Sequence, residues 1–123
     1  MSKARTAVLI SGRGSNMMAL VRAACDASYP AEIVCVVSNT ADAKGLAFAA
    51  VNGIPAAVID HKAHASRADF EAALDSHLRA MEVEIIALAG FMRVLTADFI
   101  AGWEGRIINI HPSLLPAYKG LHS

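Results

Sequence analysis

The sequence predicts an α/β protein with a Rossmann-like, mostly parallel sheet and helices on both faces. Short continuous apolar runs alternate with stretches in which apolar residues recur at helical spacing. The apolar runs lack the polar alternation of a half-exposed sheet, so both of their faces are expected to be buried. Strands separated by helices need crossover connections, which favour parallel pairing. The expected strands are residues 7–10, 33–37, 56–59, 84–89 and 107–111.

Each expected helix has its own local signals. The first helix is predicted from a stripe of apolar residues at helical spacing: Met17, Leu20, Val21, Ala24 and Cys25. A second helix through residues 46–50 is closed by Asn52-Gly53, a typical C-terminal signal. Ser66, with an acid three residues later, is a weak capping box that opens a third helix. A short fourth helix is expected over residues 96–102.

The composition restricts the class of protein. The 123 residues, 55% hydrophobic and 18% charged, suit one globular domain with a real core. The formal net charge of zero argues against a large nucleic-acid surface or a polybasic membrane surface. Cys25 and Cys35 lie among apolar residues and are expected to be buried free thiols, which indicates a reducing compartment. The first apolar run is too short for a signal peptide, and no run reaches the roughly 20 residues of a membrane helix, so a cytoplasmic location is expected.

A glycine-containing loop, residues 11–16, lies between the first strand and the first helix. The free N–H groups and the positive end of the helix dipole make such a loop an anion site. Met17 stands where a dinucleotide site needs a small residue, the second strand ends without an acid, and the Gly-Lys-Ser/Thr of a nucleotide-triphosphate loop is absent. A single phosphate monoester therefore fits best, although a plain strand-to-helix turn would leave the same pattern.

A second loop, residues 90–95, follows the fourth strand. Gly90 would let the backbone approach a ligand, and the apolar side chains beside it would line a slot for a flat aromatic group. The alternative is an ordinary connection that places Phe91 and Leu95 in the core.

The most informative stretch is the end of the fifth strand. Asn109 and His111 are two residues apart, so their side chains share one face of the strand, roughly 6.6 Å apart. Two polar groups at this position suit an oxyanion donor and an acid/base that act on one centre, although a buried pair bonded to backbone is the structural alternative. Pro112 then ends the pairing. Ligands of parallel sheets bind outside the carboxyl ends of the strands, so this pair and both loops are expected to share one crevice.

The remaining candidates give weaker signals. His61, His64 and His77 stand among polar residues and are expected at the surface, without the spacing of a zinc site. Arg67 begins a helix, where a cation is mildly unfavourable, and this hints at a neighbouring acid or ligand, although a solvated arginine is the commoner case. Trp103 is expected in the core or at an interface.

Three segments, in this order, resemble the phosphoribosylglycinamide formyltransferase family: Ser11-Gly12-Arg13-Gly14-Ser15-Asn16, Gly90-Phe91-Met92-Arg93 and Asn109-Ile110-His111-Pro112-Ser113-Leu114-Leu115-Pro116. The resemblance runs the full length of the chain. The last segment is shared with other formyltetrahydrofolate enzymes, whereas the first points to the glycinamide ribonucleotide branch. The formyltransferase fold that the resemblance implies agrees with the predicted α/β architecture.

The resemblance implies a role for each segment. The phosphate of glycinamide ribonucleotide would be held by Gly14, Ser15 and Asn16. The folate site would comprise Arg67, Met92, Arg93, Val94 and Leu95. Asn109 and His111 would be the catalytic pair for formyl transfer from the co-substrate 10-formyltetrahydrofolate to the glycinamide amine, in purine biosynthesis. No metal, nucleic acid or membrane is implied, and a homodimer is one expected assembly.

Elementary chemistry agrees with these roles. Attack of an amine on a formyl carbon builds an oxyanion, which Asn109 can stabilise by donating a hydrogen bond. His111 can move protons between the attacking amine, the oxyanion and the leaving folate nitrogen. Three rivals stay open: a formyltetrahydrofolate hydrolase, a formyltransferase for aminoacyl-tRNA, which the zero net charge disfavours, and a phosphate-binding module without catalysis.

The chain departs from the family in its length. Members of the family are longer, and the aspartate that positions their catalytic histidine lies beyond Ser123. Asp98 and Glu104 precede the fifth strand and do not replace that aspartate. A sheet that stops at its fifth strand would also leave an edge and an apolar face uncovered. We therefore expect residues 1–123 to form a single domain that is truncated at its C-terminus, with binding residues present and turnover weak or absent.

Overall fold

A computed structural model describes residues 3–12, 15–41, 43–92 and 95–110 of the chain. Its described strands form one sheet in the order β3-β2-β1-β4-β5, and each neighbouring pair is parallel. The parallel pairing confirms the prediction. The strand bounds are β1 (Ala4–Ile10), β2 (Ala31–Ser38), β3 (Ala56–Val58), β4 (Ile85–Leu88) and β5 (Ile107–Asn109).

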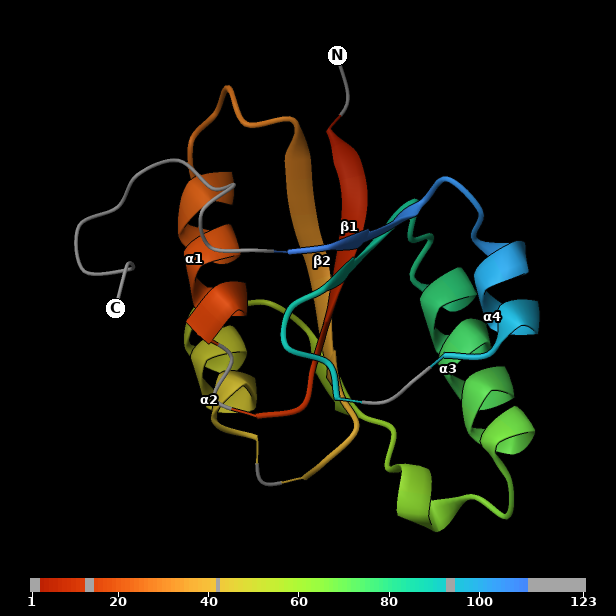
Figure 1. Cartoon of the computed structure of the whole chain (residues 1–123). Coiled ribbons are helices and arrows are strands. Elements are labelled where there is room, and N and C mark those ends of the chain that lie inside the picture. Colours follow the sequence, from red (N-terminus) through yellow and green to blue (C-terminus); the bar gives the residue numbers. More distant parts are fainter. Residues whose placement is uncertain (1–2, 13–14, 42, 93–94, 111–123) are drawn as a thin grey trace.

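Helices cover both faces of this sheet, as predicted. Figure 1 shows α1 and α2 on one side of the strands, with α3 and α4 on the other. The helix bounds are α1 (Ser15–Ala24), α2 (Lys44–Val51), α3 (Arg67–Ala80) and α4 (Ala97–Gly102), with a 3₁₀ turn, η1 (His61–Ala63), before α3. Within the described ranges, no helix is both long and apolar enough to cross a bilayer.

Strand β1 shows why the apolar runs are continuous. Ala7 and Leu9 pack into the cluster under α3 and α4, whereas Val8 and Ile10 pack into the cluster under α1 and α2. All four side chains are fully buried. Because alternate residues of a strand point to opposite faces, a strand covered on both faces needs apolar residues at every position. Burial of each larger side chain contributes roughly 1.5–3 kcal/mol.

The helix-terminal signals have their expected partners. The Ser66 hydroxyl accepts a hydrogen bond from the Asp69 amide at 3.1 Å and caps α3. Asn52 ends α2, and Gly53 follows with a φ of +71°, a conformation that favours glycine. Thr96 caps α4 by accepting a bond from the amide of Phe99. The predictions for Ser66 and Asn52-Gly53 are confirmed, because a cap depends only on residues close in sequence. The Thr96 cap was not predicted.

Every strand differs from its expected bounds by one to three residues at one end or both; β5, for example, ends at Asn109 rather than at residue 111. Two differences have the same cause. β1 begins at Ala4 rather than residue 7, because polar Arg5 and Thr6 also pair with β2. The turn η1 was not predicted; the Asp60 carboxylate accepts a hydrogen bond from the Lys62 amide at 2.8 Å and starts it. In both places polar side chains lie within regular structure, where apolar periodicity gives no signal.

Trp103 anchors α3 against α4 from within the core. The residue is fully buried, which confirms its predicted core location. Its indole N–H donates to Asp75 Oδ1 at 2.8 Å. The guanidinium groups of Arg79 and Arg106 lie 4.1 and 4.6 Å from the centre of the indole ring. The polar tip of the tryptophan is therefore satisfied while its rings remain dry.

The two free cysteines lie in different environments. Cys35 is buried, as expected, and burial raises the pKa of its thiol to about 11, while the positive charge of Arg5 acts in the opposite direction. Cys25 is exposed, so the expectation of burial is wrong for this residue. The helix ends at Ala24, and the Cys25 amide bonds to Arg22 O in a tighter turn, so Cys25 leaves the phase of the apolar stripe.

Candidate functional site

Parallel pairing brings four chain segments together where the strands end, at the side of the sheet that is called the carboxyl edge below; the side where the strands begin is the amino edge. Asn39 follows β2, Ser11 follows β1, Gly90 follows β4 by one residue, and Asn109 ends β5. These strands are consecutive neighbours, about 4.8 Å apart from one to the next. The strand order reverses at β1, with β2 on one side and β4 on the other, which is where ligands of such sheets bind.

Asn109 lies at the carboxyl end of β5 with its side chain exposed. Its Cα pairs with Leu88, which in turn pairs with Leu9, so the three residues form one row across the sheet. The amide of Ile110 still donates to Leu88 O at 2.9 Å, which fixes the backbone after Asn109. Among the described residues, the Asn109 side chain makes no hydrogen bond. Within the described residues nothing holds this side chain, and His111 lies outside them.

The predicted anion loop leads into the N-terminus of α1. Ser15 is the first residue of the helix and is exposed, and Asn16 is half-buried. The first turn of α1 contains no acidic residue, so no side chain of its own repels an anion there. The free N–H groups of the first turn face the same edge as Asn109 because α1 follows a parallel strand. Gly14 lies outside the described residues.

The loop after β4 divides into a buried part and an exposed part. Gly90 has a φ of +78°, a left-handed conformation that favours glycine. Phe91 and Leu95 pack with the cluster under α3 and α4, which is the core packing that the sequence left as the alternative. Met92, in contrast, is 79% exposed. Arg93 and Val94 lie outside the described residues.

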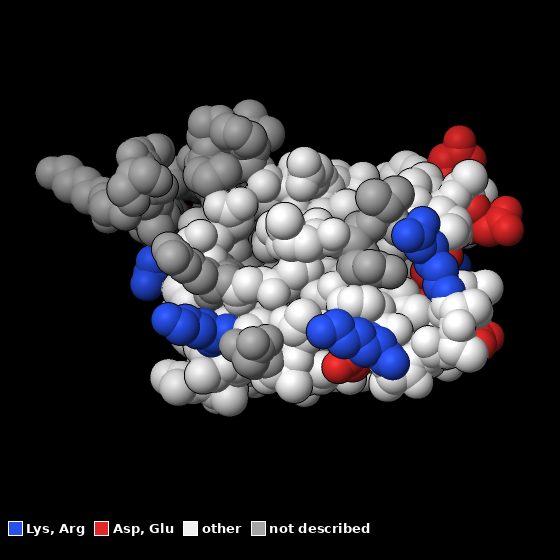
Figure 2. All heavy atoms as spheres, turned by 60° about the horizontal axis from the view of Figure 1, so that its bottom comes forward, with Lys and Arg blue, Asp and Glu red and all other residues white. Residues whose placement is uncertain are grey.

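Cations occur where helices begin at this edge. Arg67 is the first residue of α3 and is exposed, as are Lys44 at the start of α2 and Lys62 in η1. Figure 2, which brings the lower side of Figure 1 forward, shows Lys and Arg side chains across this face, with most acidic atoms toward one side. Such a distribution favours the approach of an anionic ligand.

The expectation that the minor histidines lie at the surface is wrong in degree. His61, His64 and His77 are all half-buried. The rings of His61 and His64 each form a T-shaped pair with the Phe70 ring, with centroid distances of 6.4 and 6.1 Å. In the part of the chain that the structure describes, no three His, Cys, Asp or Glu side chains are grouped to hold a metal ion.

The sequence did not indicate the hydrogen-bonded group beneath the two loops. The Ser11 hydroxyl donates to Asn39 Oδ1 at 2.6 Å and accepts from the backbone N–H of Met92 at 2.8 Å. Asn39 Nδ2 lies 3.4 Å from His61 Nδ1. The available signal was that polar residues directly follow apolar strands, but nothing local indicates that these residues meet.

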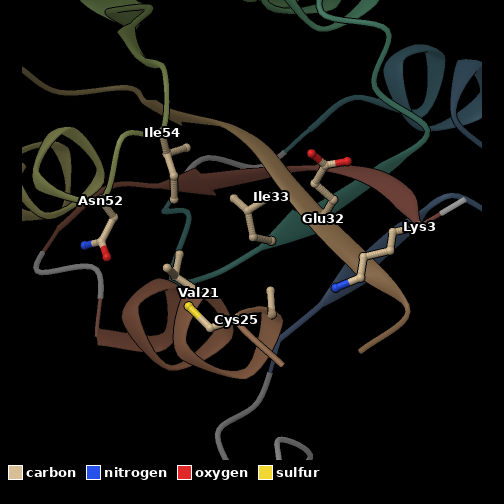
Figure 3. A pocket seen from close by; sticks show the side chains of 8 residues that line it. Lys3, Val21, Cys25, Glu32, Ile33, Asn52 and Ile54 are labelled. Carbon is tan, nitrogen blue, oxygen red and sulfur yellow. The ribbon is translucent and has the colours of Figure 1, made fainter. Parts of the chain in front are cut away.

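A groove elsewhere on the molecule does not belong to this site. A groove of about 210 Å³ lies beside the last turn of α1 and the first residues of β2. Figure 3 shows the side chains that line it. Val21, Cys25, Ile33 and Ile54 are among the residues that line it. Strand β2 starts there, so the groove lies at the amino end of the sheet, opposite to Asn109.

Known proteins resemble this chain along its whole length. A family model described as formyl transferase matches residues 4–123. The trifunctional purine biosynthetic protein adenosine-3 of Gallus gallus is 51% identical over 122 residues, which are 99% of this chain and 12% of that protein. The phosphoribosylglycinamide formyltransferase of Haemophilus influenzae is 43% identical over 119 residues, or 97% of this chain and 56% of that protein.

Solved structures agree with the sequence comparisons. The crystal structure of phosphoribosylglycinamide formyltransferase from Brucella melitensis superposes with a TM-score of 0.87 at 50% identity. The superposition covers 98% of this chain and 63% of that one. This chain thus spans somewhat more than half the length of its bacterial relatives and a small part of the trifunctional protein.

Proposed function

The chain belongs to the formyl transferase family, and on this premise we propose that it transfers a formyl group from 10-formyltetrahydrofolate to the amine of glycinamide ribonucleotide in purine biosynthesis. The observation that carries the proposal is the meeting of three segments at one sheet edge: the start of α1, the loop after β4 and the end of β5. Two relatives that are named as phosphoribosylglycinamide formyltransferases match 97% and 98% of this chain, and these matches support the proposal.

The ribonucleotide phosphate would bind at the N-terminus of α1. Ser15 offers a hydroxyl and Asn16 an amide, and the N–H groups of the first turn add donors that have no partner within a helix. Gly14 would allow the backbone to approach the phosphate closely. The exposed cations along this edge would favour the phosphate further.

The folate would lie against the loop after β4. Met92 offers an exposed apolar surface, and Arg93, Val94 and Leu95 continue that segment. Because the Leu95 side chain packs inward, its contribution would come from its backbone. Arg67 would contact the outer part of the folate.

Formyl transfer needs a donor for the oxyanion and a group that moves protons. Attack by the glycinamide amine turns the formyl carbon tetrahedral and places negative charge on its oxygen. The Asn109 N–H₂, exposed and without a partner among the described residues, would donate to that oxygen. His111 would accept the proton of the attacking amine and return one to the leaving folate nitrogen.

The reaction distinguishes this proposal from its rivals. The chain is incubated with 10-formyltetrahydrofolate with and without glycinamide ribonucleotide, and tetrahydrofolate, formate and formylated ribonucleotide are measured. We expect tetrahydrofolate release that depends on the ribonucleotide. Formate release without the ribonucleotide would instead identify a hydrolase, and ribonucleotide binding without turnover would identify a binding module.

A His111→Ala variant tests the assigned chemistry. We expect formyl transfer to be lost while ribonucleotide binding is kept, because the imidazole moves protons and the phosphate binds elsewhere. Equal loss of binding and transfer would contradict that assignment.

A cytoplasmic location and a homodimeric assembly stay predictions, which cell fractionation and sedimentation can check.

A further inference from the structure

Ser11 is the one side chain in the described residues that bonds to both neighbouring edge loops. A hydroxyl has one proton to donate and lone pairs to accept with. In Ser11 the proton goes to Asn39 Oδ1 at 2.6 Å, and a lone pair accepts the Met92 N–H at 2.8 Å. The bond to Asn39, in the loop after β2, therefore orients the Ser11 hydroxyl. In that orientation the hydroxyl oxygen accepts the N–H of Met92, in the loop after β4.

Asn39 holds that direction because it is itself fixed. Its side chain is 3% exposed, and its backbone N–H donates to Ile10 O. Its Oδ1 accepts the Ser11 proton, and its Nδ2 lies 3.4 Å from His61 Nδ1. The backbone of Ser11 is also held, since the Thr40 hydroxyl donates to Ser11 O at 3.1 Å.

This contact lies outside the sheet and is not needed to pair the strands. The last ladder bond between β1 and β4 runs from Ala89 N to Leu9 O at 3.0 Å. The bond from Met92 to Ser11 comes after Gly90, whose φ of +78° turns the chain. It therefore joins two loops, one leading to Ser15 and the other carrying the exposed Met92.

We propose that Ser11 is a positioning residue that couples the phosphate site to the folate site. The inference rests on the proposed function, which assigns the two loops to the two substrates. Ser11 bonds to the Met92 amide before any ligand is present. A phosphate held at the start of α1 would restrict the segment that leads to Ser11, so that this bond would open less often. A folate that binds the loop after β4 would favour the same bonded arrangement, so each substrate would raise the affinity for the other by the same factor.

Binding of a non-reacting pair tests the coupling. Tetrahydrofolate carries no formyl group, so its dissociation constant can be measured by calorimetry with and without saturating glycinamide ribonucleotide. We expect the ribonucleotide to tighten tetrahydrofolate binding by about fivefold or more in the unaltered chain, the lower end of usual couplings. In Ser11→Ala we expect this ratio to fall to within about twofold of one.

Matched variants separate coupling from general damage. Ser11→Thr keeps the hydroxyl and should keep the ratio. Ser28→Ala removes a hydroxyl bonded to Asp26 at the opposite edge and should also keep it. If Ser11→Ala does not fold, Ser11→Cys replaces it, because a thiol of similar shape accepts hydrogen bonds poorly.

Hydrogen exchange at the Met92 amide gives a second readout. Ribonucleotide should slow this exchange in the unaltered chain and leave it unchanged in Ser11→Ala. If both chains bind both ligands and the ribonucleotide changes the tetrahydrofolate dissociation constant equally in the unaltered chain and in Ser11→Ala, the coupling is overturned. The proposed function is not affected by that result. Absence of binding of either ligand to the unaltered chain would overturn the proposed function, and the coupling with it.

Discussion

The two edges of the sheet use their polar groups differently. At the amino edge, the Arg5 guanidinium donates to the carbonyls of Met81 and Glu82, and Lys3 Nζ donates to Asp26 O. At the carboxyl edge, Ser11 bonds to side chain and backbone of separate loops, while Asn109 stays exposed. The polar groups of the amino edge thus bond within the protein, whereas the carboxyl edge combines such bonds with an exposed side chain, Asn109.

The acid-base properties of the amino edge agree with this difference. Two hydrogen bonds hold the pKa of the Asp26 carboxyl below its usual range: the larger effect comes from the backbone N–H of Ser28 and the smaller from its hydroxyl. Both donors come from the same turn between α1 and β2. The groove in Figure 3 lies at this edge, and the ammonium group of Lys3, one of its lining residues, is bonded to protein backbone. The groove therefore belongs to the amino edge of the sheet.

The largest effect is expected from Asn109→Ala at the carboxyl edge. Loss of one oxyanion donor should lower formyl transfer by about 10²-fold or more. The free energy of unfolding should barely change, because the side chain is exposed. Steady-state kinetics and urea denaturation measure the two quantities. A decrease in transfer of less than threefold would remove Asn109 from the mechanism.

Arg5→Met, at the amino edge, should lower the stability of the fold without changing the affinity for the ribonucleotide. The variant keeps an apolar stem but leaves the carbonyls of Met81 and Glu82 without the guanidinium, which should lower the free energy of unfolding by about 1.5–3 kcal/mol. Lys44→Met is the matched control at the other edge and should change it by less than about 0.5 kcal/mol. Weaker ribonucleotide binding by folded Arg5→Met would show that the edges are not independent.

Ser15→Asp should change stability and binding in opposite directions. A carboxylate at the start of α1 favours the helix dipole and should stabilise the fold by about 0.3–1 kcal/mol. The same charge should repel the phosphate and lower ribonucleotide affinity by roughly tenfold or more, as for a lost hydrogen bond to a charged group. Thermal denaturation and calorimetry test both directions. Unchanged affinity would mean that residues 11–16 are a plain strand-to-helix turn.

The smallest effect is expected from Glu82→Gly. Glu82 has a φ of +56° directly after the C-cap of α3, where glycine is the preferred residue. We expect a gain of about 1 kcal/mol or less in the free energy of unfolding. Glu82→Ala removes the same charge but keeps the Cβ, so it should give no such gain. Equal gains in both variants would assign the effect to charge.

Local sequence signals predicted most of the fold. The apolar runs gave the strands, Ser66 and Thr96 marked two helix starts, and Asn52-Gly53 marked a helix end. The same reasoning failed where a local pattern continued past its element, as at Cys25, or where polar residues formed structure, as at Arg5 and η1. The periodicity of apolar residues predicts elements that contribute to the core, and it does not predict structure that polar residues form.

The sequence by itself determined the parallel α/β architecture and the position of polar residues after the apolar strands, because both follow from periodicity and neighbours along the chain. Only the tertiary structure decided which polar residues meet. Ser11 bonds to Asn39, 28 positions away, and to Met92, 81 positions away. Those contacts depend on the strand order β2-β1-β4, which no local pattern encodes. The same order places Asn109 and Ser15 at the carboxyl edge of the sheet, where the sequence had predicted both.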